Sequence, residues 1–291
     1  MIGVITGTPL GEALAARLRA DGREVVAGRD PAALAQMARA RLVVVDATPH
    51  ELRALGRAFG DVSDGDQLLA HTVRGLVEGA GGIEVLLSET PCLRVGVIGG
   101  PLSPADLIAG RPTAAVIASR HPEVVEEFAT ALSTPKLRLY RGRDPLGVEL
   151  ASTLPDLVAL GWGLSSALGF GPNTRAVLLV RAVRELGRLA QALGGDPITA
   201  SGLAGLGDML VRGSDTEGAA FKYGAQLAGA APVTPPPELD DTLENARAIR
   251  ALARSHRVRV HIFEGLADLI DGKLPAADLV GRLMTLPVLD D

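Results

Sequence analysis

Hydrophobic residues in the first half of the chain form short runs that are separated by stretches with helical spacing. Residues 2–5 and 42–46 are continuous runs, whereas residues 12–20 carry their apolar side chains on one helical face. Continuous runs are typical of strands buried on both sides, so the alternation predicts a doubly wound parallel sheet. The other expected strands lie at residues 24–27, 67–72, 85–87, 94–98, 114–118 and 137–140.

From residue 145 onward the apolar spacing is helical. Helices are expected at residues 146–168, 173–194, 197–211, 216–229 and 238–255, and in pieces at 262–290. This change of period predicts an α/β domain at 1–144 and an all-helical domain at 145–291. The proline-rich segment 231–237 is interpreted as a stiff loop within the helical domain, not as a linker between domains.

The composition is that of a globular protein with a sizeable core. Of 291 residues 47% are hydrophobic, and the formal net charge is -5. The chain has no basic patch and no apolar run near the roughly 20 residues of a membrane span, so neither nucleic acid nor a membrane is an expected partner. The single cysteine, Cys92, is interpreted as a small buried hydrophobe. We predict a cytoplasmic protein without a signal peptide or a metal site.

The segment T-G-T-P-L-G follows the first strand and precedes a helix, where a dinucleotide fingerprint would lie. Of the three glycines of that fingerprint only Gly11 is in phase, because Gly7 is displaced by one position. Thr8 adds a side chain where the backbone would approach a pyrophosphate, and Pro9 removes an N–H donor. The N-terminus of the following helix still offers an anion site, and the predicted cofactor site includes Leu10 of this turn. Two interpretations stay open, a nucleotide-phosphate turn and a plain strand-to-helix turn.

Arg29 follows the second predicted strand, at the position that reads the ribose 2′ group in a Rossmann fold. An arginine there favours NADP over NAD if a nucleotide is bound, and the alternative is a solvated surface arginine. Thr48 and Pro49 follow the third strand, at the carboxyl edge of the sheet where ligands lie. We include both in the predicted cofactor site and interpret His50 as a surface histidine.

The most specific pattern lies in the helical half, in the words GVELASTLPD, SSALGFGPNTRA and GLAGLGD. With VVAGRDP and GGPLSPADLIAGRP in the first half, these ordered words resemble the bacterial NAD(P)-dependent glycerol-3-phosphate dehydrogenases over essentially the whole chain. The resemblance implies a Rossmann-type NAD(P)-binding domain, a 6-phosphogluconate-dehydrogenase-like helical domain for a small-molecule substrate, and a homodimer. It also implies hydride transfer between NADP or NAD and a small hydroxy or keto compound, in glycerol phospholipid metabolism.

The resemblance assigns roles to individual residues. Asp208 of GLAGLGD and Asn173 of SSALGFGPNTRA match the family pattern, and Arg74 stands where the family has the lysine of a T-K-G word. With Asp156, these are the predicted catalytic residues. The predicted substrate-binding residues are Arg212, Lys222, Gly100 and Pro101.

The chain departs from the family where chemistry is expected. The general acid–base lysine of an L-K-N word is replaced by Pro155, which has neither a proton to give nor a charge. An arginine stays protonated in proteins, so Arg74 can orient a substrate but cannot shuttle a proton. The Arg-Asn pair that clamps the substrate phosphate is replaced by Ala219 and Ala220, and a threonine by Arg212.

These departures leave three hypotheses about function. The chain is an oxidoreductase of the family, a catalytically inactive relative that binds a small molecule or a partner, or a dehydrogenase with a changed, non-phosphorylated substrate. Taken together, the departures argue against ordinary glycerol-3-phosphate oxidation. Asp156 and Asp208 could form a carboxylate pair in the cleft, but we interpret them as caps of a helix and a turn.

Overall fold

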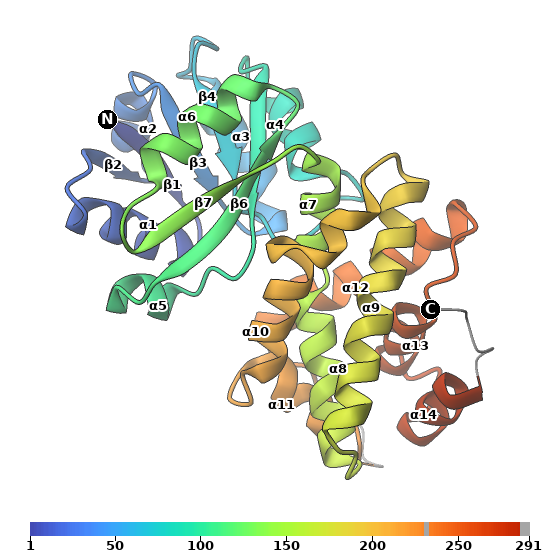
Figure 1. Cartoon of the computed structure of the whole chain (residues 1–291). Coiled ribbons are helices and arrows are strands. Elements are labelled where there is room, and N and C mark those ends of the chain that lie inside the picture. The colour runs from blue at the N-terminus through green and yellow to red at the C-terminus, as the bar shows by residue number, and fades with distance from the viewer. Residues whose placement is uncertain (230–232, 286–291) are drawn as a thin grey trace.

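The first half of the chain folds around a seven-stranded sheet (Figure 1). The computed structural model describes residues 1–229 and 233–285. The strands are β1 (Ile2–Thr6), β2 (Val25–Gly28), β3 (Leu42–Asp46), β4 (Leu68–His71), β5 (Arg94–Gly99), β6 (Thr113–Ser119) and β7 (Leu137–Gly142). Their order in the sheet is β2-β1-β3-β4-β5-β6-β7, and every pair of neighbours is parallel except β5 and β6.

Helices cover both faces of this sheet and bury a separate hydrophobic cluster on each. They are α1 (Pro9–Ala20), α2 (Pro31–Met37), α3 (Pro49–Gly60), α4 (Gly82–Glu89), α5 (Pro104–Ala109) and α6 (Pro122–Leu132). Thr8, Asp30 and Thr48 each cap a helix whose first residue is proline. A capping oxygen and a residue that lacks an N–H suit a helix start, so the local sequence places these helices.

Two details of the predicted sheet are wrong. Residues 85–87 were expected to form a strand but lie in α4, where Val85 and Leu86 are buried and Leu87 is exposed. A short apolar run cannot be assigned to strand or helix from its periodicity alone. The sheet is also not wholly parallel, because β6 runs antiparallel to β5. The link between these strands holds only the short helix α5, so β6 starts at the edge where β5 ends.

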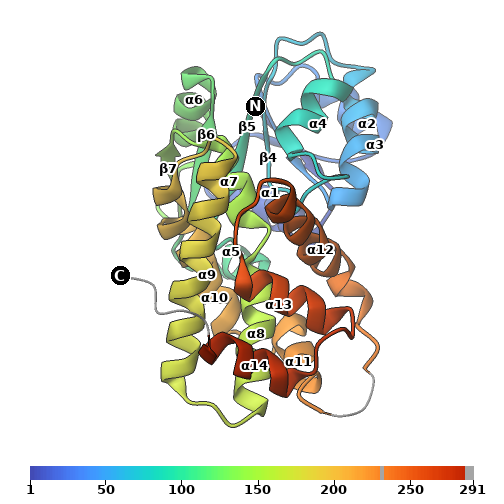
Figure 2. The ribbon, with the colours of Figure 1, turned by 90° about the vertical axis from the view of Figure 1, so that its right-hand side faces the viewer.

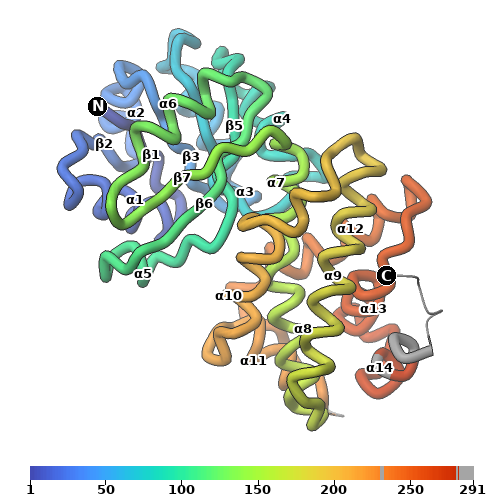
Figure 3. The backbone as a smooth tube through the Cα atoms, in the orientation of Figure 1, coloured from blue at the N-terminus to red at the C-terminus, as the bar shows by residue number. Residues whose placement is uncertain are grey.

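After β7 the chain passes into a bundle of helices (Figure 3). Its α-helices among the described residues are α7 (Pro145–Ser152), α8 (Pro155–Ala167), α9 (Pro172–Ala192), α10 (Asp208–Ser214), α11 (Ala219–Gln226), α12 (Asp240–Ser255), α13 (His261–Ile270) and α14 (Ala276–Thr285). The short turns η1 (Pro197–Ser201), η2 (Leu203–Gly207) and η3 (Pro237–Leu239) complete the set. Within the described residues no helix is long and apolar enough to cross a membrane.

Two of the predicted helices are divided in the structure. The helix expected at 146–168 is interrupted before Pro155, because proline supplies no N–H to continue the hydrogen-bonded ladder. The helix expected at 197–211 begins as a 3₁₀ turn, continues as a π turn through most of GLAGLGD, and becomes α10 only at Asp208. Parts of the helix expected at 262–290 and of the loop at 231–237 lie outside the described residues.

The centre of the bundle is α8, which α11 crosses at very close range. A Cβ added to Gly163 would lie 1.9 Å from the carbonyl oxygen of Phe221, and one added to Gly224 would lie 1.9 Å from that of Leu160. Backbone therefore packs directly on backbone at this crossing. On the other side of the bundle α12 lies below α3 of the sheet domain (Figure 2), and its residues Asp241, Thr242 and Asn245 line a cleft between the two domains.

Candidate active-site cleft

A cavity of about 280 Å³ lies between the carboxyl edge of the sheet and the helical bundle. From the sheet side it is lined by Thr8, Pro9, Leu10, Asp46, Thr48, Pro49, Thr72 and Arg74. From the helices it is lined by Asp156, Arg212, Glu238, Asp241 and Asn245, among others. The structure thus brings most of the predicted cofactor residues and three of the predicted substrate and catalytic residues to one place.

Arg74 and Asp208 form an ion pair that joins the two halves of the chain. Arg74 lies in the loop after β4, and its Nη1 donates to Asp208 Oδ2 at 2.5 Å while Nη2 donates to the Gly100 carbonyl oxygen at 2.9 Å. Asp208 is only 1% exposed. Burial raises the pKa of Asp208, and the neighbouring positive charge of Arg74 opposes that shift. The guanidinium of Arg74 is therefore paired with a buried carboxylate.

Asp156 and Asp208 do not act as the caps that we expected. No side chain caps the N-terminus of α8 or of α10. Asp156 faces Arg212, with 3.6 Å between Oδ1 and Nη1, and Arg212 Nε lies 3.9 Å from Asp208 Oδ1. Both carboxylates thus belong to one charged cluster, in which Arg74 and Arg212 supply the positive charges.

The loop that carries Arg74 is held from both domains by residues that the sequence did not single out. Asn245 of α12 is buried, accepts the Leu76 N–H at 3.1 Å, and donates to the Arg74 carbonyl oxygen at 3.2 Å. His71 Nδ1 accepts the Val73 N–H at 3.2 Å. These bonds leave the loop little freedom. An asparagine on the apolar face of a predicted helix was the one available signal.

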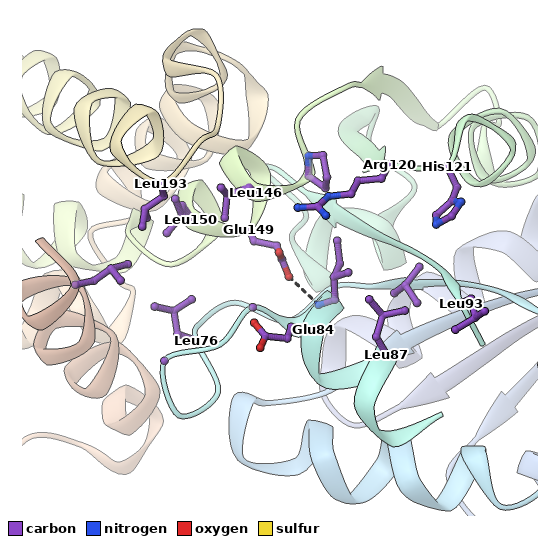
Figure 4. Close-up of a pocket in the computed structure, with 16 residues that line it drawn as sticks. Leu76, Glu84, Leu87, Leu93, Arg120, His121, Leu146, Glu149, Leu150 and Leu193 are labelled. Carbon is purple, nitrogen blue, oxygen red and sulfur yellow. Dashed lines mark hydrogen bonds between the residues drawn. The ribbon is translucent and has the colours of Figure 1, made fainter. Parts of the chain in front are cut away.

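Beneath this loop His71 also contacts the helical bundle. Because Nδ1 accepts a hydrogen bond, Nε2 carries the proton and donates to Glu149 of α7 at 3.0 Å. Glu149 accepts the Ile83 N–H at 2.8 Å as well (Figure 4). A second cavity of about 430 Å³ opens here, and its lining includes seven leucines together with Glu84, Glu149, Arg120 and His121. None of the residues predicted for the site lines it.

The turn between β1 and α1 is packed around Asp46, the last residue of β3. Its Oδ2 accepts the Thr8 N–H at 2.7 Å, and its Oδ1 accepts the Thr72 hydroxyl at 2.7 Å. The Thr8 hydroxyl accepts the Leu10 N–H at 3.1 Å. Burial raises the pKa of Asp46, and the hydrogen bonds that it accepts from Thr72 and Thr8 oppose the shift. Sequence reasoning missed Asp46, which reads as the end of an apolar strand.

Arg29 and Thr48 have partners within the chain. Arg29 is exposed and pairs with Glu51, with 3.1 Å between Nη1 and Oε1. Thr48 caps α3 by accepting the Glu51 N–H at 3.3 Å. Arg29 does not line the cavity, whereas Thr48 and Pro49 do. The side chain that was expected to meet a 2′-phosphate is thus engaged by a carboxylate.

Asn173 and Lys222 also lie outside the lining of the cleft. Asn173 is exposed at the first turn of α9, at the end of the bundle remote from the sheet (Figure 1). Lys222 lies on α11 and pairs with Glu217 at 2.9 Å. The carbonyl oxygen of Gly100 accepts a hydrogen bond from Arg74, and the carbonyl oxygen of Pro101 accepts the Thr113 hydroxyl at 3.1 Å.

The arrangement of a Rossmann-type sheet and a helical bundle that meet at a cleft is that of the two-domain dehydrogenases. The glycerol-3-phosphate dehydrogenase structure from Coxiella burnetii matches with a TM-score of 0.83 at 21% identity, over 98% of each chain. A D-mandelate dehydrogenase structure with NADH matches with a TM-score of 0.60 at 12% identity, over 94% of this chain and 98% of that chain. These similarities establish the fold.

Sequence comparison then identifies the family. The family "NAD-dependent glycerol-3-phosphate dehydrogenase C-terminus" matches residues 144–281. A glycerol-3-phosphate dehydrogenase [NAD(P)+] of Aromatoleum aromaticum is 33% identical over 90% of this chain and 81% of its own length. One from Sinorhizobium fredii is 31% identical over 88% and 78%, respectively. The chain belongs to the glycerol-3-phosphate dehydrogenase family.

Proposed function

We propose that this chain is a small-molecule-binding member of its family that does not oxidise glycerol 3-phosphate. It would bind its ligand in the cleft between a Rossmann-type domain at 1–144 and a helical domain at 145–291. The homodimer that the resemblance implies stays a prediction.

One observation carries this proposal. Among the described residues that line the cleft, the ionisable ones are Asp46, Asp156, Glu238, Asp241, Arg74 and Arg212. The resemblance gives the uptake and release of the substrate proton to a lysine of the family. Lysine, histidine, tyrosine and cysteine are absent from this lining. At the position of the family lysine, Pro155 begins α8 and is buried.

The phosphate end of the expected substrate site supports the same proposal. Ala219 and Ala220 form the first turn of α11 in place of the Arg-Asn clamp. Alanine cannot form the charge-assisted hydrogen bonds that hold a phosphate. The nearest lysine, Lys222, is paired with Glu217, so it does not replace the missing charge.

A second candidate function is oxidation or reduction of a non-phosphorylated hydroxy or keto acid. It is favoured by Asp156 and Arg212, which lie side by side in the cleft and are both partly exposed. In that case Arg212 would orient the substrate carboxylate, since a guanidinium binds carboxylates in a fork geometry. Asp156 would act as the base.

The test is a turnover assay beside the Aromatoleum aromaticum relative. Purified protein is mixed with glycerol 3-phosphate and NAD or NADP, and with dihydroxyacetone phosphate and NADH or NADPH, while nicotinamide absorbance is followed. We expect no turnover above the rate without protein. Turnover comparable to that of the relative would refute the proposal. Glycerate and lactate are assayed in the same way with NAD or NADP. Turnover of either of them without turnover of the phosphorylated compounds would favour the second candidate.

Ligand binding is tested by the melting temperature, which rises when a ligand binds the folded state. Glycerate and lactate are the probes because each carries a hydroxyl and a carboxylate. We expect stabilisation of the wild type and a smaller effect in Arg212→Gln. Arg141→Gln, at an exposed arginine of β7 that pairs with Glu126, is the matched control. No stabilisation of the wild type by either compound would count against this ligand class.

A further inference from the structure

The backbone N–H groups of the turn between β1 and α1 are all used in hydrogen bonds within the chain. The Gly7 N–H donates to the Asp46 carbonyl oxygen at 2.8 Å, and the Thr8 N–H donates to Asp46 Oδ2 at 2.7 Å. Pro9 has no N–H, and the Leu10 N–H donates to the Thr8 hydroxyl at 3.1 Å. In a dinucleotide-binding turn such N–H groups hold the pyrophosphate. From residue 7 to residue 10, none remains for a ligand.

The carboxylate of Asp46 occupies the place where these donors converge. Asp46 is 1% exposed and also accepts the hydroxyls of Thr72 at 2.7 Å and of Thr8 at 3.2 Å. A Cβ built on Gly11 would lie 2.7 Å from Asp46 Oδ2, so the carboxylate rests against the first turn of α1. A negative charge is stabilised there by the partial positive charge of the helix N-terminus.

We infer that Asp46 takes the place of the dinucleotide pyrophosphate and excludes NAD(P) from this turn. An approaching phosphate would meet a carboxylate of like charge. It would also meet the Thr8 side chain and the Pro9 ring where a fingerprint needs close approach of the backbone. Thr8, Pro9, Leu10 and Asp46 all line the cleft, so the conflict lies where the nucleotide would enter.

The rest of the nucleotide site offers no compensation. Arg29, at the position that would meet a 2′-phosphate, is paired with Glu51. The N-terminus of α3 is capped by Thr48. The residues of this chain therefore do not fit the cofactor that its family implies. The residues that exclude the cofactor are distinct from Pro155, Ala219 and Ala220, which replace the residues that the family uses on its substrate.

Isothermal titration calorimetry of the whole chain with NADH and with ADP-ribose tests the inference. The wild type should bind both with a Kd weaker than about 1 mM, since the β1–α1 turn has no free backbone N–H between residues 7 and 10 to hold the pyrophosphate. Asp46→Asn removes the charge with little change of shape and should strengthen binding. The triple variant Thr8→Gly/Pro9→Ala/Asp46→Ala also frees the donors, and it should bind ADP-ribose at least about tenfold more tightly than the wild type.

The matched control is Asp106→Asn, an exposed carboxylate that pairs with Arg111 and should leave binding as weak as in the wild type. Thermal melting followed by circular dichroism checks that each variant folds. If the triple variant does not fold, the wild type and Asp46→Asn decide the matter. Micromolar binding of NADH by the wild type, or no gain in a folded Asp46 variant, would overturn the inference.

The outcomes separate this inference from the proposed function. A wild type that binds NADH tightly but does not oxidise glycerol 3-phosphate contradicts only the role of Asp46. A wild type that oxidises glycerol 3-phosphate with NAD or NADP contradicts both. Weak binding in the wild type with a gain in the triple variant supports the role of Asp46, whatever substrate the cleft takes.

Discussion

Replacing Arg74 by methionine should destabilise the whole protein, because it leaves a buried carboxylate without its main partner. Asp208 is 1% exposed, and the next nearest cation, Arg212, has its Nε 3.9 Å away. Removing one partner of a buried ion pair costs about 3–5 kcal/mol. The Arg74 side chain is 21% exposed, and Arg212 can move toward the carboxylate, so we expect the lower end of that range, about 3 kcal/mol.

The measurement is the free energy of unfolding from urea titrations of Arg74→Met, Asp208→Asn and the double variant. Because the two side chains touch, the double variant should be less destabilised than the sum of the single ones by about 1–3 kcal/mol. In Arg74→Met the pKa of Asp208 should rise further above its unfolded value. The folded state then binds a proton more tightly, so the deficit should shrink as the pH falls.

The matched control is Arg111→Met, which removes an arginine from the exposed pair with Asp106. Exposed pairs contribute about 0–1 kcal/mol, so this variant should be close to the wild type. If Arg74→Met lost no more stability than Arg111→Met, and the single effects added without coupling, the pair between the two domains would not stabilise the fold.

Two further predictions concern the helical bundle. Glu185 is buried and accepts the Ile262 N–H, and burial raises its pKa from 4.5 to about 7. Its folded pKa exceeds its unfolded pKa, so stability should fall by roughly 3 kcal/mol as the pH rises from about 4.5 to about 7. Glu185→Gln should remove this part of the slope in urea titrations at several pH values, and an unchanged slope would contradict the assignment. Gly163→Ala should cost on the order of 1–3 kcal/mol through overpacking against Phe221. Gly171→Ala, which has open space around it, should melt near the wild type, and equal melting temperatures for the two variants would refute the close α8–α11 crossing.

Local chemistry was enough to predict most of the elements. Thr8, Asp30 and Thr48 are each followed by proline, a pattern that suits a helix start, and each caps a helix in the structure. The change to helical spacing after residue 144 coincides with the end of β7 and the start of α7. The strand predicted at residues 85–87 is wrong because the periodicity of a short apolar run does not distinguish a buried strand from a buried helix.

The candidate site was predictable only in part. The words shared with the family pointed to Asp208, Arg74 and Asp156, which the structure brings into one charged cluster. The same words pointed to Asn173, which lies exposed at the remote end of α9. Similarity of sequence indicates common descent of a segment, but it does not say which side chains of that segment face the cleft.

The sequence alone determined the class of fold, the family and the absence of a lysine where the family has its acid–base group. These follow from periodicity and from residue identity, which are read along the chain. Only the tertiary structure decided what Asp46 and Arg74 do. Asp46 meets Thr8 across 38 positions and Arg74 meets Asp208 across 134. The charge state and partner of a buried group depend on which side chains the fold places around it, and neither is encoded in its neighbours along the chain.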